Sequence, residues 1–173
     1  MPSLRAKLAG DFSAVSVSIV SMPFKDLRHP PIQLGILQRC LERAGIAARS
    51  HSLELTFMDH LYEKTVGSEP VTVAQYQRIA TREFRLHLGD WIFKVPPYAD
   101  CSDDTDEKYV EHIRSNGVCD EAIAIARRMR SLVPEFLEVA ADELLAGRPQ
   151  VVGFSSVFQQ NVASLVLAKI LKA

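Results

Sequence analysis

The sequence predicts an α/β fold in three layers, with helices around a parallel sheet. A β-branched run at 15–20, a segment with helical periodicity and a second strand at 47–55 follow each other within about forty residues, which is a β-α-β unit. A short apolar run at 151–154 and an apolar helix repeat this order. Helical patterns without a convincing strand occupy 57–147. We therefore expect a Rossmann-like sheet, incomplete, with a long helical insertion between its second and third strands.

The first unit has clear boundaries. Pro23 ends the strand at 15–20, because proline cannot donate to a sheet ladder. Pro31 suits the first turn of a helix, and apolar residues then recur at helical spacing until Gly45, which suits the position after a helix. Cys40 lies on the apolar face of this helix and is expected in the core.

The insertion at 57–147 is read as helices and loops. Residues 73–88 have a helical pattern, and the acidic stretch at 100–107 is expected to be a solvated loop. Residues 119–145 predict one long helix, interrupted or kinked near Pro134. Connections in α/β units usually have about 2–6 residues, so an insertion of this length is an elaboration with a purpose.

The last predicted unit leaves the sheet short. Residues 151–154 form a short buried strand, and residues 162–172 form a helix that is apolar on nearly every face. Doubly wound domains usually have about five or six strands, and only three are predicted here. We expect 1–173 to be a single, partial domain that is the front part of a larger design or needs a partner to complete it.

Composition excludes several classes of protein. The 20 Lys and Arg residues balance 21 Asp and Glu residues, so bulk charge does not favour nucleic-acid binding. The sequence has no apolar run of about 18 residues and no secretory signal pattern, so we expect no membrane association. Three cysteines without C-x-x-C spacing predict reduced thiols in a cytoplasmic protein, and neither a disulfide nor a metal site.

Familiar catalytic patterns are missing from the sequence. It contains neither nucleotide-binding glycine fingerprint, no H-E-x-x-H and no G-x-S-x-G. Asp59 and His60 are adjacent, and neighbours on a helix do not face each other, so an unconnected surface pair is expected. Trp91 and Phe93 are expected in the core rather than on a stacking surface.

Two expected strand ends carry the candidate site, because ligands of open parallel sheets bind beyond the carboxyl ends of the strands. The candidates combine small hydroxyls, amides and apolar groups: Met22, Pro23, Phe24, Gln33, Ser155, Ser156, Phe158, Gln159, Gln160 and Asn161. Neutral donors and acceptors near a helix N-terminus suit an uncharged, amide-rich ligand. The alternative is that Ser156 or Asn161 only caps the following helix.

Several of these segments together resemble one family. They are MPF at 22–24, PIQLGIL at 31–37, LERAGI at 41–46, GDWIF at 89–93 and VGFSSVFQQNVASL at 152–165. In this order they resemble the cobalamin-dependent radical S-adenosylmethionine enzymes that mature ribosomally made peptides, often as C-methyltransferases. The last segment is the most specific part of the resemblance.

The resemblance implies a cobalamin-binding region whose corrin or amide side chains contact the candidate residues. It also implies a radical domain with an iron-sulfur cluster, S-adenosylmethionine and a precursor peptide as further cofactors and partner. Because none of the three cysteines has cluster spacing, we expect that machinery outside this sequence, on a further domain or chain. The string Asp26-Leu-Arg-His29 departs from D-x-H-x-x-G, so no histidine ligand to cobalt is expected.

Two other interpretations remain open. The chain is alternatively a non-catalytic interaction module that docks on a partner, or self-associates, through an open sheet edge and its apolar last helix. It is also read as an inactive fragment.

Overall fold

The computed structural model describes residues 14–64, 70–98 and 103–173. Its centre is a parallel sheet of three strands in the order β2-β1-β3, formed by β1 (Ser16–Ser21), β2 (Ala47–Ser52) and β3 (Val151–Ser155). The central strand β1 pairs in parallel with both neighbours, so the carboxyl ends of all three strands lie at the same end of the sheet. The predicted α/β fold with a long helical stretch between the second and third strands is confirmed. Cys101 lies outside the described residues.

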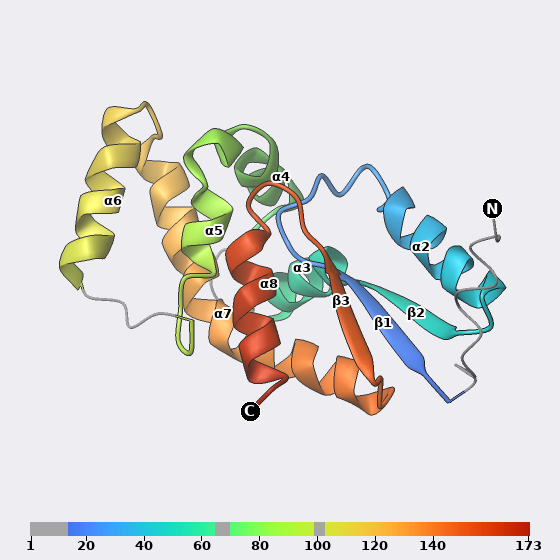
Figure 1. Cartoon of the computed structure of the whole chain (residues 1–173). Coiled ribbons are helices and arrows are strands. Elements are labelled where there is room, and N and C mark those ends of the chain that lie inside the picture. Colours follow the sequence, from blue (N-terminus) through green and yellow to red (C-terminus); the bar gives the residue numbers. More distant parts are fainter. Residues whose placement is uncertain (1–13, 65–69, 99–102) are drawn as a thin grey trace, which may run out of the picture.

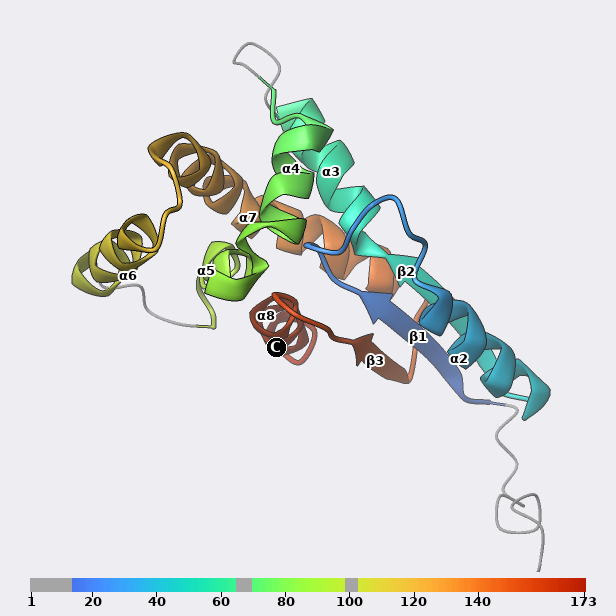
Figure 2. The ribbon, with the colours of Figure 1, turned by 90° about the horizontal axis from the view of Figure 1, so that it is seen from above.

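Helices flank the sheet on both faces. Helix α2 (Ile32–Arg43) packs on β2 and β1 on one face, and α3 (Leu53–Lys64) contacts β1 from the other (Figures 1 and 2). The long helix α7 (Asp120–Ala146) packs against α3, and α8 (Asn161–Ile170) packs against α5 and α7 beside β3. The helices are therefore concentrated on the α3 face, and α2 covers only part of the other.

The second strand is shorter than the sequence predicts. β2 ends at Ser52 and α3 begins at Leu53, whereas the alternation suggested a strand through residue 55. Leu53, Phe57 and Leu61 are fully buried along one face of α3. Residues four apart share one face of a helix, so a helix buries these three large side chains together. This burial favours a helix from Leu53 over a longer strand.

The insertion consists of helices. They are α4 (Val73–Thr81), the short 3₁₀ helix η1 (Glu83–Leu86), α5 (Leu88–Ile92), α6 (Asp103–Ser115) and α7. The expected acidic loop at 100–107 is wrong for its described part, because α6 begins at Asp103. Asp106 on α6 accepts a hydrogen bond from Arg130 at 2.8 Å, so this charge stabilises the packing of α6 on α7. Helix α7 runs without interruption through Pro134.

An aromatic core fills the space between the sheet and the insertion. Phe57 contacts Phe136 of α7 at 4.7 Å between ring centroids, and Phe93 packs against both. Trp91 and Phe93 are buried, as predicted. His60 is also buried against Phe136 while Asp59 is exposed, so the expected surface pair is wrong for His60. Burial of these rings supplies much of the apolar stabilisation of the fold.

The third strand and the α2 face are more open than predicted. β3 is exposed at Val151 and half-buried from Val152 to Ser155, because only β1 pairs with it among the described residues. Cys40 is exposed rather than in the core, since α2 leaves this face uncovered. In α8, Leu165 is exposed. No helix within the described ranges has the length and apolar character needed to cross a bilayer.

Candidate functional site

The two predicted strand ends meet, and the amides between them point inward. Gln160 is fully buried, and its side-chain amide donates to the backbone carbonyl of Met22. Gln159 is also fully buried; it accepts a hydrogen bond from the Gly89 amide at 2.8 Å and donates to the Ile79 carbonyl at 3.2 Å. These two glutamines therefore connect the β3 end to the β1 end and to the insertion.

Gly89 makes this junction possible. A Cβ on Gly89 would lie 2.6 Å from a ring carbon of Phe24 and 2.8 Å from the Cβ of Gln159. Phe24 and Gln159 both have left-handed backbones, with φ of 70° and 64°, which is a strained conformation for side chains of this size. The Phe24 amide donates to the Tyr76 hydroxyl at 2.6 Å.

The predicted residues thus separate into two groups. Met22, Pro23, Phe24, Gln159 and Gln160 are buried in the junction, where they position the strand ends.

The others face outward or lie half-buried: Gln33, Ser155, Ser156, Phe158 and Asn161. Ser156 donates to the side-chain oxygen of Asn161 at 2.8 Å, and neither caps α8. Asp90 instead accepts from the Val162 amide at 3.0 Å, so a residue of the insertion holds the first turn of α8. The capping alternative is therefore wrong, and no local sequence signal identified Asp90.

An apolar groove of about 330 Å³ lies between α2 and β3. Its lining comes from α2, β1 and β3: Ile19, Leu37, Cys40, Leu41, Gly153, Phe154 and Ser155. A Cβ on Gly153 would meet no atom within 4 Å, so the glycine leaves free space in the groove. Ser155 places the groove at the carboxyl end of β3. A glycine inside an apolar strand was the available signal for a close approach of a ligand.

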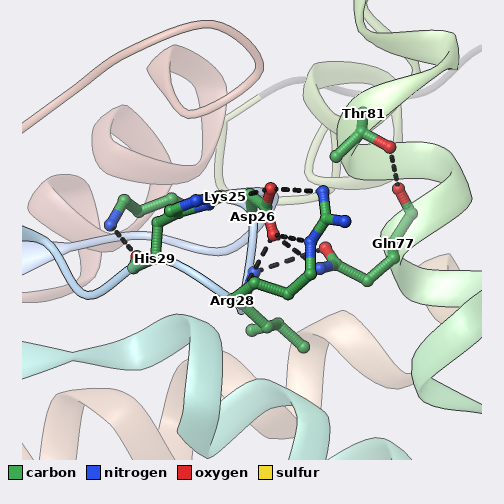
Figure 3. Close-up of polar contacts among 7 residues, drawn as sticks. Lys25, Asp26, Arg28, His29, Gln77 and Thr81 are labelled. Atoms are coloured by element: carbon green, nitrogen blue, oxygen red, sulfur yellow. Dashed lines mark hydrogen bonds and ion pairs between the residues drawn. The ribbon is translucent and has the colours of Figure 1, made fainter.

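A polar cluster follows β1 in the loop at 25–29 (Figure 3). Asp26 accepts hydrogen bonds from Arg28 at 2.8 and 3.0 Å and from the side chain of Gln77 on α4 at 2.6 Å. These donors, Arg28 first, hold the pKa of the Asp26 carboxyl far below its usual range. His29 contacts the same carboxylate at 3.1 Å. The cluster fastens the loop to α4.

Glu54 is a buried carboxyl that follows the carboxyl end of β2. It lies in the first turn of α3, 3% exposed, and its Oε2 has no hydrogen-bond partner among the described residues. Burial raises the pKa of Glu54 more than the neighbouring Ser21 and Ser52 hydroxyls and Lys25 lower it. Glu54 lies in a stretch whose alternation predicts a strand, so no sequence pattern points to a buried carboxyl there.

Ser18, His51 and Glu143 form a chain of contacts that resembles a nucleophile, base and acid. Ser18 lies 3.3 Å from one ring nitrogen of His51, and Glu143 lies 3.1 Å from the other. Ser18, however, is 4% exposed in the middle of the central strand, paired on both sides. A buried residue whose backbone belongs to two ladders offers no oxyanion donors, so the contacts connect β1, β2 and α7 structurally.

Within the described ranges, no three histidine, cysteine or acidic side chains gather into a metal site. No family model matches the chain, and comparison with curated proteins and with solved structures finds no significant similarity to either. The candidate site therefore rests on its own geometry: an apolar groove that reaches Ser155 at the carboxyl end of β3, with the exposed Ser156 next in the chain.

Proposed function

We propose that this chain is the cobalamin-binding module of a cobalamin-dependent radical S-adenosylmethionine enzyme that C-methylates a ribosomally synthesised peptide. The observation that carries the proposal is the apolar groove between α2 and β3, with open space over Gly153. The groove reaches Ser155 at the carboxyl end of β3, and α/β sheets bind their ligands beyond such strand ends. The ordered sequence motifs support the same assignment.

The residues present fit part of such a cofactor. Apolar groups of the groove, among them Leu37 and Phe154, suit an apolar face of the corrin ring. Ser155, Ser156 and Asn161 offer hydroxyl and amide groups to the cofactor's amide side chains, and Phe158 offers an exposed ring. Bound cobalamin would supply the methyl group for transfer. The iron-sulfur cluster, S-adenosylmethionine and the precursor peptide would be held by a further domain or chain.

The buried candidates act indirectly in this proposal. Met22, Pro23, Phe24, Gln159 and Gln160 set the positions of the two strand ends and do not line the cofactor. Gln33 is half-buried in the first turn of α2 and does not line the groove.

A titration with hydroxocobalamin tests the proposal. We expect saturable binding by the wild-type chain and at least tenfold weaker binding by Gly153→Phe, because the ring occupies the groove. Gly35→Ala is the matched control: Gly35 is on α2, and its added Cβ also meets nothing within 4 Å. Absence of saturable binding, by the chain alone and joined to a radical domain, would reject the proposal.

The coordination of cobalt gives a second readout. His29 is the histidine on the loop after β1, and Asp26 already holds one of its ring nitrogens. We expect the absorption spectrum of the complex to show no histidine ligand and to be unchanged in His29→Ala. A histidine-coordinated spectrum that His29→Ala abolishes would contradict this expectation.

A second candidate function is an interaction module, and the open edge of β3 favours it. β3 pairs only with β1 among the described residues. Val151 on β3 and Val157 just after it are exposed, and so is Leu165 on α8. Unpaired strand edges and exposed apolar groups are typical of docking surfaces. Size-exclusion chromatography with light scattering is expected to show self-association or a complex with a partner chain. A monomer that binds no partner would exclude this function.

A further inference from the structure

A cavity of about 380 Å³ lies between the loop after β1 and one side of α4 (Val73–Thr81). The residues that line it are Arg28, Ala74, Gln77, Arg78, Thr81 and Arg82. Among the described residues, the lining thus contains three arginines and no acidic side chain. Arg28 comes from the loop, Arg78 from α4, and Arg82 directly follows the end of α4. Guanidinium groups from two separate elements thus converge on one space.

We propose that this cavity binds the phosphate group of a small phosphorylated molecule. Guanidinium groups present several N–H donors in a planar arrangement that matches the oxygens of a phosphate, and each such hydrogen bond is strengthened by charge. The volume accommodates a phosphate or pyrophosphate group together with part of the molecule that carries it.

The three arginines differ in how much of their charge is already neutralised. Arg28 makes two hydrogen bonds to Asp26, at 2.8 and 3.0 Å. Arg78 lies 3.5 Å from Glu83 and 3.7 Å from Glu121. Arg82 is exposed at the end of α4, and its guanidinium makes no ion pair or hydrogen bond with any described residue. Arg82 is therefore the cation that an incoming anion would engage first.

The carbonyl end of α4 offers a competing explanation for two of the arginines. A helix C-terminus carries partial negative charge, which attracts Arg78 and Arg82 without any ligand. That effect does not account for Arg28, which belongs to a different element. Figure 3 shows the Arg28 guanidinium beside Asp26, near the Gln77 and Thr81 positions of α4. The convergence, rather than the number of arginines, supports an anion site.

Asp26 lies outside the cavity lining, but its carboxylate holds two of the lining side chains, Arg28 and Gln77. Its carboxylate accepts from Arg28 and from the Gln77 amide, the groups that a bound phosphate would also contact. Asp26 therefore competes with an external anion for Arg28. Removing its charge should strengthen phosphate binding, whereas removing Arg82 should weaken it. A purely structural arrangement predicts neither effect.

The proposal does not rest on the cobalamin assignment. The cavity and the α2–β3 groove have no lining residue in common. Its test uses no cobalamin, so the two proposals fail separately.

Isothermal titration calorimetry with inorganic phosphate and with pyrophosphate, at constant ionic strength, tests the site. We expect saturable binding, tighter for pyrophosphate. Arg82→Ala is expected to weaken it roughly tenfold, the loss typical of one charge-assisted hydrogen bond. Asp26→Asn is expected to tighten binding severalfold, while its retained side-chain oxygen still accepts from Gln77.

Arg39→Ala is the matched control, since Arg39 is an exposed arginine on α2 that pairs with Glu42 away from the cavity. Circular dichroism confirms that each variant is folded. The proposal is overturned if neither anion binds saturably, if Arg39→Ala weakens binding as much as Arg82→Ala, or if Asp26→Asn fails to strengthen it.

Discussion

Gly89 is the residue on which the packing of the two strand ends depends. Its missing side chain leaves the space that Phe24 and Gln159 occupy, because a Cβ on Gly89 would lie 2.6 Å from a Phe24 ring carbon and 2.8 Å from the Gln159 Cβ. We expect Gly89→Ala to lower the free energy of unfolding by about 1–3 kcal/mol, because overpacking must displace an aromatic ring and a strained loop. Urea unfolding measures the change.

Gly35 provides the comparison for that prediction. It lies in α2, and an added Cβ would meet no atom within 4 Å. Gly35→Ala should raise the free energy of unfolding by about 0.5–1 kcal/mol, since alanine loses less backbone entropy in a helix. Equal effects of the two substitutions would show that the Gly89 contact is unimportant.

Glu54 predicts a pH-dependent stability. Burial raises its pKa above the ordinary value of 4.5, so the folded state favours the protonated carboxyl. The stability that this protonation contributes is complete below 4.5 and is lost as the pH rises through the raised pKa. The charge of Lys25 lowers the pKa of Glu54, and the charge of Glu54 in turn raises the pKa of the buried Tyr76 hydroxyl.

Glu54→Gln should therefore be more stable than the wild type at pH 7, by about 1 kcal/mol, because a neutral amide avoids the cost of a buried charge. The difference should vanish below the ordinary carboxyl pKa. Unfolding curves between pH 4 and pH 8 would reveal this convergence. A variant less stable than the wild type at every pH would show that the ionised carboxyl stabilises the fold.

Among the elements, α7 contains an exposed proline that the helix tolerates. Pro134 has no amide hydrogen to donate to the Arg130 carbonyl, yet α7 continues from Asp120 to Ala146. Buried residues on both sides of the proline, among them Val133 and Phe136, anchor the helix on the core. Apolar packing therefore outweighs the local cost.

Pro134→Ala should restore the missing hydrogen bond and stabilise the protein by about 1–2 kcal/mol, after the added flexibility of the unfolded chain is subtracted. Differential scanning calorimetry would record a higher Tm. An unchanged or lower Tm would indicate that the proline itself is needed for the packing of α7.

Element boundaries were predictable where local chemistry is strong. The start of α2 followed from Pro31, and the end of β1 followed from Pro23. The end of β2 was not predictable from its alternation, because the same polar and apolar residues fit a strand until α3 buries Leu53. Acidic α6 was mistaken for a loop, since its ion pair with Arg130 comes from a distant helix.

At the scale of the whole molecule, much of the hydrophobic core is formed by the helical insertion, and β3 contributes little to it. Helix α7 buries Met129, Val133, Phe136 and Leu137, whereas β3 is at most half-buried. Regions with many buried apolar contacts open least often. We expect hydrogen exchange to be slowest in α7 and in the central strand β1.

Exchange in β3 should be faster by orders of magnitude, because one of its edges has no neighbour among the described residues. Mass spectrometry of proteolysed, exchanged protein resolves these elements. Equal protection of β3 and β1 would mean that something covers the open edge in solution. Loss of that protection on dilution would identify the cover as a second copy.

Local patterns in the sequence were enough to determine the α/β class, the parallel sheet and the helical insertion, because periodicity and the placement of proline and glycine act over a few residues. They also located both strand ends. Only the tertiary structure decided which side chains there remain available. Gln159 and Gln160 look like surface amides in the sequence, but Gly89 and Met22, far away along the chain, turn them inward. A buried polar group must find its partners wherever the fold brings them, and that choice is not written in neighbouring residues.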